Sequence, residues 1–487
     1  MIMLLNECSK TGKSGVTLPC CDVPEKALTD YFSQALLRDK APELPELSEP
    51  EVVRHFTNLS SLNHHLDKGF YPLGSCTMKY NPKVNDAAAA HPAFSGLHPL
   101  QSSQSLQGAM QIYGEVEQYL CAVTGMNAFT LQPAAGSHGE LTGVMIMRKY
   151  HASKGQNKSI ILIPDSAHGT NPASVAIGGF KAVTVNSTSE GLVDIEDLKK
   201  KLTPEVAGFM LTNPNTLGIF EENVVEIARL IHQQDGLMYM DGANMNALLG
   251  IVKTADMGFD ITHINLHKTF STPHGGGGPG SGPIGVNKKL AQFLPTPVIK
   301  KDGKNWVFDW NRPDSIGHVL SFWGHFGVII RAWAYIRMLG AKGLREVAEN
   351  AIINANYIRA RLEGIYELPY KKRSMHEIVF SGDKQKSRGA KTLDIAKRLL
   401  DYGIHAPTIY FPLIVHEAIM IEPTETEKLE TLDQFIETML TIDEEISNDL
   451  EKVTKAPWTT PVSRLDEGRA NRELNIKWQD GTAIKTE

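Results

Sequence analysis

A lysine near the middle of this sequence lies where a nucleophilic amine could be held at the end of a buried strand. Lys268 occupies the segment Asn265-Leu266-His267-Lys268-Thr269, which ends the apolar run Ile261 to Leu266. A buried lysine is costly unless it is paired, and a desolvated lysine amine can form a Schiff base with a carbonyl compound. A solvated lysine at a strand end is the simpler explanation when Lys268 is considered alone.

An aspartate comes directly after another apolar run. Asp241 follows Leu237 to Met240 and is itself followed by Gly242. Open α/β sheets bind their ligands outside the carboxyl ends of the strands, so Asp241 is expected at a ligand-binding position. A carboxylate beside a pyridine nitrogen favours the protonated ring, because an opposite charge stabilises the cation. An aspartate that ends a strand can equally be a helix cap or a turn residue.

A loop of small residues provides a possible phosphate site. Gln132-Pro133-Ala134-Ala135-Gly136-Ser137-His138-Gly139 precedes a helix that is expected to begin near Glu140. Exposed N–H groups at a helix start bind phosphate well, although such loops are common and the signal is weak alone. A lysine, an acid and a phosphate site are together the three groups with which a protein uses pyridoxal 5'-phosphate.

Three further features near these groups have more than one interpretation. His168, in Ser166 to Pro172, could stack on a flat ring or could be a turn histidine bonded to backbone. The run Gly275 to Gly282 does not satisfy G-x-G-x-x-G at a strand-to-helix turn, so it predicts a mobile or tightly folded segment beside the site. The adjacent pair His64-His65 does not face one site and has no third ligand, so no metal is assigned.

From about residue 105 onward, short apolar runs alternate with segments of helical periodicity, and these elements must position the groups described above. Short apolar runs separated by helical periodicity are typical of a mostly parallel, doubly wound sheet with crossover helices. The expected strands are Ile160 to Ile163, Ala182 to Val185, Val206 to Leu211 and Leu237 to Met240, and the expected helices include Asp194 to Leu202 and Val224 to Gln234.

The remainder of the chain predicts further domains. A long helical stretch from Phe326 to Leu362, punctuated by glycines, is a natural hinge. Beyond it a smaller α+β unit is expected, with strands near Ile378 to Phe380 and Ala418 to Ile421, a helix near Leu393 to Tyr402 and another from about Glu427. The predicted division is an N-terminal arm at 1–60, a large cofactor-binding domain at 61–330, a small C-terminal domain at 331–455 and an extension at 456–487.

Composition excludes several other classes of protein. The 487 residues suggest about two or three domains. With 49 basic against 55 acidic residues, a net charge of −6 does not favour binding to nucleic acid. No stretch has the apolar length of a membrane span or of a signal peptide. Five cysteines without a C-x-x-C pair fit a reducing compartment, and we expect a cytoplasmic protein.

Three segments together resemble glycine dehydrogenase (decarboxylating), the P-protein of the glycine cleavage system. They are Asp241 to Asn246, Asn265 to Phe270 and Pro273 to Gly280. Gly74-Ser75-Cys76-Thr77-Met78-Lys79, Ser166 to Pro172 and Ile421-Glu422-Pro423-Thr424-Glu425 agree with the same family, so the resemblance extends from about residue 50 to 450. The family exists as one long chain of two homologous halves or as two subunits, and this chain resembles the second half.

The resemblance implies a fold-type I pyridoxal-phosphate architecture and assigns roles to particular residues. Lys268 is expected to form the Schiff base, Asp241 to contact the pyridine nitrogen and His168 to lie over the ring. His267, Gly136 and Ser137 are expected to bind the phosphate, and Thr212 to approach the ring hydroxyl. At Ser137 the expected contact is through the backbone N–H, because the residue type at this position varies in the family.

The resemblance also implies a reaction and partners. Glycine would lose carbon dioxide, and its aminomethyl group would pass to the lipoyl arm of the H-protein. A separate first subunit would complete the enzyme, in a two-plus-two heterotetramer. Two alternatives remain open from the residues alone: another fold-type I enzyme, such as an aminotransferase or desulfurase, and a non-catalytic assembly subunit.

Overall fold

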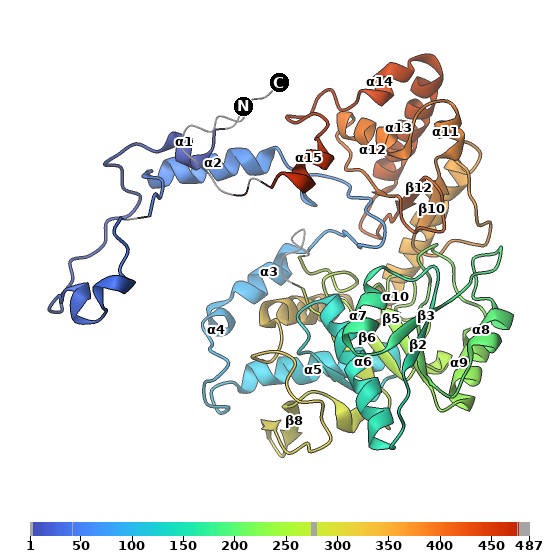
Figure 1. Cartoon of the computed structure of the whole chain (residues 1–487), viewed down its shortest axis with the longest axis horizontal. Coiled ribbons are helices and arrows are strands. Elements are labelled where there is room, and N and C mark those ends of the chain that lie inside the picture. Colours follow the sequence, from blue (N-terminus) through green and yellow to red (C-terminus); the bar gives the residue numbers. More distant parts are fainter. Residues whose placement is uncertain (1–2, 41, 274–279, 475, 477–487) are drawn as a thin grey trace. The chain divides into compact units, whose positions relative to one another are not determined.

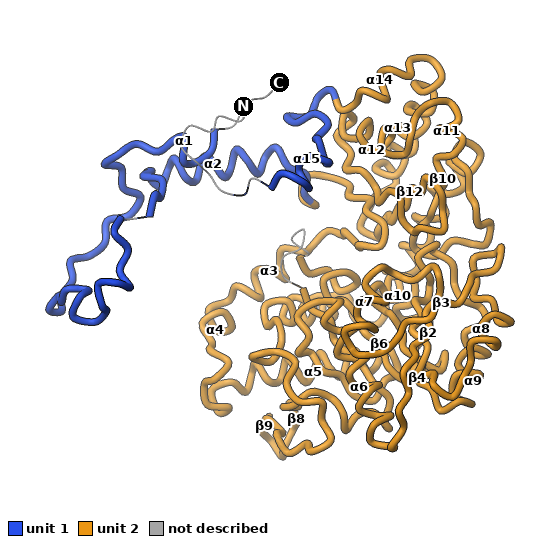
Figure 2. Tube along the Cα trace, viewed as in Figure 1, with its two compact units in different colours: residues 1–65, 458–487 blue, residues 66–457 orange. Residues whose placement is uncertain are grey.

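The computed structural model describes residues 3–40, 42–273, 280–474 and 476. The chain forms two compact units, which Figure 2 shows in separate colours. Unit 1 comprises Met1–His65 and Trp458–Glu487, and unit 2 comprises Leu66–Pro457. The predicted division of the chain at residues 60, 330 and 455 stays a prediction.

Unit 1 consists of short helices joined by extended segments. The longest is α2 (Glu49–Ser61), which begins with a capping box in which the backbone N–H of Ser48 donates to Glu51 Oε2 at 2.9 Å. None of the helices of unit 1 contains a buried residue in the part that the structure describes; besides α2 they are α1 (Leu5–Cys8), α15 (Glu467–Arg472) and the 3₁₀ turns Leu28–Asp30 and Gln34–Leu36. Unit 1 therefore has almost no core of its own.

A seven-stranded mixed sheet organises unit 2 (Figure 1). In spatial order the strands are β1 (Ala128–Thr130), β7 (Ile284–Val286), β6 (Ile261–Ile264), β5 (Leu237–Gly242), β4 (Val206–Thr212), β2 (Ile160–Pro164) and β3 (Lys181–Val185). Five neighbouring strands are parallel. At one edge β7 pairs antiparallel with β6, and β1 pairs antiparallel with β7. The prediction of a mostly parallel α/β sheet is confirmed, as are the four strands expected between residues 160 and 240.

Side chains alternate between the two faces of this sheet, and each face has its own apolar core. Phe209 and Met240 pack in one core, whereas their neighbours Met210 and Tyr239 pack in the other. Helices cover both faces, as in a doubly wound fold. Helices α5 (Gln107–Thr124), α8 (Ile195–Lys201), α9 (Val224–Gln233) and the first part of α10 (Phe326–Leu362) contribute to the first core, and α6 (Gly136–Ser153) and α7 (Thr170–Ile177) contribute to the second.

Smaller elements border the sheet. A two-stranded hairpin, absent from the sequence-based expectations, pairs β8 (Val298–Asp302) with β9 (Asn305–Asp309). The remaining short elements of this region are α3 (Lys83–Ala90), α4 (Pro92–Ser95) and the 3₁₀ turns Thr254–Met257 and Ala291–Phe293.

A second, three-stranded antiparallel sheet lies in the C-terminal part of unit 2. Helix α10 runs into this region and departs from helical geometry at Gly340, whose φ is 63°. The sheet has the order β10 (Ile378–Ser381), β12 (Ala418–Ile421) and β11 (Thr408–Ile409). It is joined by α11 (Asp383–Ser387), α12 (Thr392–Asp401), α13 (Leu429–Asn448) and α14 (Leu450–Thr454), which confirms the predicted smaller α+β arrangement.

None of the described helices combines the length and apolar character needed to cross a membrane. All five cysteines are free thiols.

Candidate active site

The register of the central sheet brings three polar side chains together at the carboxyl ends of its strands. Thr212 in β4 pairs with Asp241 in β5, which in turn pairs with His263 in β6. In parallel strands, paired residues point to the same face of the sheet. The alternation places these three residues on the face that α6 and α7 cover. Asp241 therefore occupies the strand-end position that the sequence predicted.

Asp241 is buried among groups that favour its ionised form. Its Oδ2 accepts a hydrogen bond from Asn171 Nδ2 at 3.0 Å, and its Oδ1 lies 3.3 Å from His263 Nε2. The other ring nitrogen of His263 is 3.0 Å from the hydroxyl of Tyr239, which fixes the imidazole. Burial raises the pKa of Asp241, but His263 and Asn171, with weaker help from Lys268, lower it more, and the net shift is downward. Asp241 is therefore a carboxylate at neutral pH.

Lys268 follows β6 and is held by a segment from far away in the sequence. Its Nζ donates to the carbonyl oxygen of Ser75 at 2.8 Å. Ser75 has a φ of 63°, a strained conformation for a residue other than glycine, and its N–H donates to Glu377 Oε2 at 3.0 Å. A strained residue thus lies between the amine and a buried carboxyl group.

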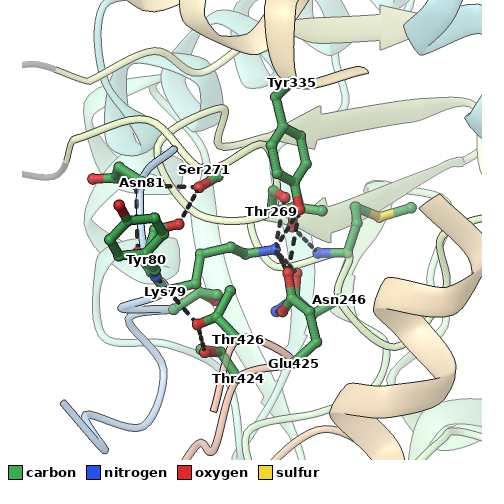
Figure 3. A network of polar contacts seen from close by, with 12 residues as sticks. Lys79, Tyr80, Asn81, Asn246, Thr269, Ser271, Tyr335, Thr424, Glu425 and Thr426 are labelled. Carbon is green, nitrogen blue, oxygen red and sulfur yellow. Dashed lines mark hydrogen bonds and ion pairs between the residues drawn. The ribbon is translucent and has the colours of Figure 1, made fainter. Parts of the chain in front are cut away.

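Another lysine, Lys79, is fully buried and fixes the neighbouring backbone, as Figure 3 shows. Lys79 Nζ donates to the carbonyl oxygen of Thr269 at 2.9 Å and to Glu425 Oε1 at 2.7 Å. It also donates to Asn246 Oδ1 at 3.1 Å and lies 3.4 Å from the hydroxyl of Tyr335. Because Thr269 adjoins Lys268, this network positions the Lys268 segment rather than offering a second reactive amine.

The start of α6 is close to the Lys268 segment. The helix begins at Gly136, and no side chain caps its first N–H groups. A Cβ atom on Gly136 would lie 2.7 Å from Asn265 Nδ2, so only glycine permits this approach. Gly282 N–H donates to the carbonyl oxygen of Pro133 at 2.9 Å, which places residues 281–282 beside the loop. Open N–H groups at a helix start, close to Lys268, form a suitable anion site.

The other predicted residues are distributed around this edge. His267 is buried and accepts from the N–H of Ser281 through Nδ1 at 3.2 Å, which places it at the same loop crossing as Gly136. Ser137 is exposed in the first turn of α6. Thr212 Oγ1 is buried and has no hydrogen-bond partner among the described residues.

His168 lies just before α7, and Nδ1 is 2.8 Å from Thr170 Oγ1. Its ring meets that of Phe411 edge to face, with centroids 5.6 Å apart. Burial lowers the pKa of His168; Asp241 opposes that shift and Lys268 adds to it. The imidazole is therefore neutral at pH 7, and it interacts electrostatically with Asp241 and Lys268. The Gly275–Gly278 run falls outside the described residues.

Pyridoxal 5'-phosphate fits this set of groups. Asp241 offers a carboxylate, Lys268 an amine and α6 an open helix start. Two buried oxygen atoms, Thr212 Oγ1 and Asn265 Oδ1, have no hydrogen-bond partner among the described residues. Buried polar atoms are normally hydrogen-bonded, so both could bind polar groups of a ligand. A site with these groups could bind a polar ring that carries a phosphate.

The structure also reveals a buried acidic cluster that the sequence analysis did not assign. His376 and Glu377 precede β10, and Glu422 follows β12. One potential ligand atom from each of these three residues lies within 4.8 Å of the others. Lys268 influences the pKa of all three, so the cluster belongs to the same region. The sequence did contain a signal, since Glu377 directly precedes the apolar strand β10 and Glu422 directly follows the apolar strand β12. This pattern does not show that the two glutamates meet.

Two family models match separate parts of the chain. A family model described as "Glycine dehydrogenase, C-terminal domain" matches residues 347–463, and one described as "Aminotransferase class-V" matches residues 139–277. "Probable glycine dehydrogenase (decarboxylating) subunit 2" of Chloroherpeton thalassium is 57% identical over 479 residues, covering 98% of this chain and 97% of that protein. The protein of the same description from Caldanaerobacter subterraneus subsp. tengcongensis is 55% identical over 476 residues, with 98% of each chain covered.

Among solved structures, the chain resembles "glycine decarboxylase (P-protein) of the glycine cleavage system, in inhibitor-bound form". The TM-score is 0.72 at 19% identity, and the match covers 85% of this chain and 94% of that one. This likeness shows a shared fold.

Proposed function

This chain belongs to the glycine dehydrogenase (decarboxylating) subunit 2 family, and from that premise we propose that Lys268, Asp241 and His168 carry out its chemistry. The enzyme decarboxylates glycine in the glycine cleavage system, with pyridoxal 5'-phosphate as its cofactor on a fold-type I scaffold. The observation that carries the residue assignment is the electrostatic interaction of one amine, one carboxylate and one neutral imidazole at or just beyond the carboxyl ends of β6, β5 and β2. The family rules out the aminotransferase, desulfurase and non-catalytic alternatives.

Each group has a task that its surroundings support. Lys268 provides the amine that binds the carbonyl carbon of the cofactor. Asp241 holds a proton on the pyridine nitrogen, since His263 and Asn171 keep it ionised. The N–H groups of Gly136 and Ser137, with His267, bind the phosphate, and Thr212 offers a hydroxyl to the ring. When bound, the cofactor supplies a sink for the electron pair that carbon dioxide leaves behind.

His168 is suited to a stacking role rather than to proton transfer. Its Nδ1 is already engaged by Thr170, and its lowered pKa keeps the ring neutral. A neutral, oriented imidazole can cover a flat ring without adding a positive charge that would compete with the pyridinium. The bond from Thr170 Oγ1 to Glu140 Oε1, 2.7 Å long, holds this orientation from α6.

We also propose the partners of the enzyme. Its relatives are second subunits, so a first subunit is the expected partner, in a two-plus-two heterotetramer. Helix α2 in unit 1 supports a partner of this kind, because Val53, Phe56 and Leu59 lie on one side of it and are 43–56% exposed. The lipoyl arm of the H-protein would receive the aminomethyl group. The five free cysteines suit our placement of the enzyme in the cytoplasm.

Exchange of labelled bicarbonate into the carboxyl group of glycine tests this function directly. The chain would be assayed with and without a first subunit and lipoylated H-protein. We expect exchange that requires the cofactor and rises steeply when both proteins are present. Transamination or desulfuration without bicarbonate exchange would contradict the proposal.

A paired variant tests the role of α2. Phe56→Asp should weaken association with the first subunit, measured by light scattering, because it places a charge on the exposed apolar side. Asn58→Asp in the same helix is the matched control, since Asn58 is an exposed polar residue. Equal association by the two variants would contradict the proposed interface.

A further inference from the structure

Two buried glutamates face each other across the small sheet, close to Lys268. Ile378 in β10 pairs with Ile421 in β12, so Glu377 and Glu422 occupy the next opposed positions. Their side chains are almost inaccessible, with 4% and 1% of their surface exposed. Like charges at opposed positions of antiparallel strands destabilise a sheet. The pair therefore needs a feature that removes one of the two charges.

The hydrogen bonds of the pair leave room for a shared proton. Glu377 Oε2 accepts from the N–H of Ser75, and Glu422 Oε1 accepts from Thr77 Oγ1 at 2.7 Å and from Asn244 Nδ2 at 2.8 Å. Glu422 Oε2 is buried and has no partner among the described residues. A proton on one carboxyl group would give that oxygen a hydrogen bond and would leave a single negative charge.

The charges around the pair support one proton rather than none. Burial raises the pKa of Glu422 to about 7, although Thr77, Asn244, Lys268 and Lys79 all lower it in part. Burial, together with Glu422, also raises the pKa of Glu377 well above its usual range. A single negative charge on the pair would match the positive charge of Lys268.

The neighbouring titratable groups do not supply further charge. Burial lowers the pKa of His376 to about 3, so its imidazole is neutral. Burial also raises the pKa of the Cys76 thiol, which stays protonated. Lys79 already forms its ion pair with Glu425. Within the described chain, Lys268 is thus the cation that remains to balance the two glutamates.

We propose that Glu377 and Glu422 hold one proton between them and deliver it to the amine of Lys268 as glycine takes the place of that amine. The proposal rests on the proposed function. An O–H bond of the pair breaks while an N–H bond forms on the departing Lys268 amine. The O–H bond is restored by the proton that the ammonium group of glycine gives up when its nitrogen bonds to carbon. Protons balance, and the step requires no oxidant.

A metal ion is the competing occupant of this cluster. His376, Glu377 and Glu422 have suitable ligand types. However, one oxygen of each glutamate already accepts hydrogen bonds, and Lys268 provides a nearby positive charge that would repel a second cation. Stoichiometric metal in dialysed wild-type protein, lost in Glu377→Gln and Glu422→Gln, would overturn the proposal.

Infrared spectroscopy can detect the shared proton without any turnover. Burial also raises the pKa of Glu427 to about 7, so each variant is compared with wild type in a difference spectrum. At pH 6 the wild-type-minus-variant spectrum of Glu377→Gln and of Glu422→Gln should contain the carbonyl stretch of one buried protonated carboxyl group, because the remaining carboxylate alone balances Lys268. Glu417→Gln is the matched control: this buried glutamate lies at the other end of β12, and bonds from Lys386 and Thr392 outweigh burial and lower its pKa. Difference spectra of both test variants that lack this band would overturn the proposal.

Rapid mixing of the cofactor-loaded enzyme with glycine tests the proton delivery. Loss of the Lys268–cofactor absorption should slow about tenfold or more in Glu422→Gln at pH 6 to 7, as expected when a general acid is removed. The wild-type rate should fall as pH rises through the ionisation of the pair, and the variant should lack that fall. Identical pH profiles would overturn delivery of the proton. A wild-type enzyme that does not respond to glycine would instead sink the proposed function, while the infrared result would still decide whether a proton is shared.

Discussion

Two buried carboxyl groups in unit 2, Asp241 at the end of β5 and Glu422 at the end of β12, have opposite electrostatic behaviour. Burial raises the pKa of both. At Asp241 the imidazole of His263 and the amide of Asn171 reverse this effect, whereas at Glu422 the bonds from Thr77 and Asn244 do not. Glu422 also faces another carboxyl group. The difference shows that burial sets a common cost and that the nearest partners decide which acid stays charged.

Removal of Lys268, the cation that acts on both carboxyl groups, should have the largest effect. We expect Lys268→Ala to lose the borohydride-sensitive visible absorption and all bicarbonate exchange, because within the described ranges of the chain no other lysine closely follows a parallel strand of the central sheet at its carboxyl end. Circular dichroism should show an intact fold. Lys288→Ala, which removes an exposed lysine, is the control and should keep both signals. Normal exchange in Lys268→Ala would show that another residue holds the cofactor.

A change at Lys79, a buried cation that lowers the pKa of Glu422, should have the second largest effect. Lys79→Met leaves Glu425 without its 2.7 Å ion-pair partner. Breaking a buried pair in this way costs about 3–5 kcal/mol of unfolding free energy. Urea denaturation would measure it, and Lys79→Met/Glu425→Gln should recover part of the loss because no unpaired charge remains. An unchanged denaturation midpoint in the single variant would mean that the ion pair contributes little.

Asp241→Asn removes the carboxyl group of the pair that stays charged, and with it the negative charge expected beside the pyridine nitrogen. We expect bicarbonate exchange to lose about 2–4 kcal/mol of transition-state stabilisation, a factor of roughly 30 to 10³. Cofactor affinity should change much less, since Lys268 and the start of α6 remain. Asp256→Asn, an exposed substitution near β6, should behave as wild type. Wild-type turnover in Asp241→Asn would place the partner of the pyridine nitrogen elsewhere.

Glu422→Gln should have the smallest effect, visible in how stability depends on pH. An unfolded glutamate has a pKa near 4.3, and that of folded Glu422 is about 7. Between these values the folded state binds more protons, so wild-type stability falls as pH rises. We expect the loss of unfolding free energy from pH 5 to pH 8 to shrink by on the order of 1–3 kcal/mol in the variant.

Glu417→Gln controls for this measurement. Bonds from Lys386 and Thr392 overcome the effect of burial and lower the pKa of Glu417, so the stability it contributes is lost on acidification rather than between pH 5 and pH 8. The same pH profile in both variants would indicate that Glu422 is ionised in the folded protein.

Local sequence patterns were enough to predict most of the elements. The apolar run Val206 to Leu211 became β4, and the amphipathic run Val224 to Gln234 became α9, because periodicity of burial is a local property. The edge strands β1 and β7 and the β8–β9 hairpin were not foreseen, since three to five residues carry too little pattern. Asp241 could be identified because it directly follows the predicted strand Leu237 to Met240, and Lys268 because it lies two residues beyond the apolar run Ile261 to Leu266.

The sequence by itself thus determined four of the parallel strands, the reactive residues near strand ends and the family that those residues resemble. Only the tertiary structure decided that Ser75 would contact both Lys268 and Glu377, which lie 193 and 302 positions further along the chain. It also decided that Glu422 would lie opposite Glu377. The same structure decided that the pKa of Asp241 would be lowered and that the pKa of Glu422 would be raised to about 7. The physical reason is that a pKa depends on the few groups within several ångströms, and for these residues strand register and chain crossings bring most of those groups from distant parts of the sequence.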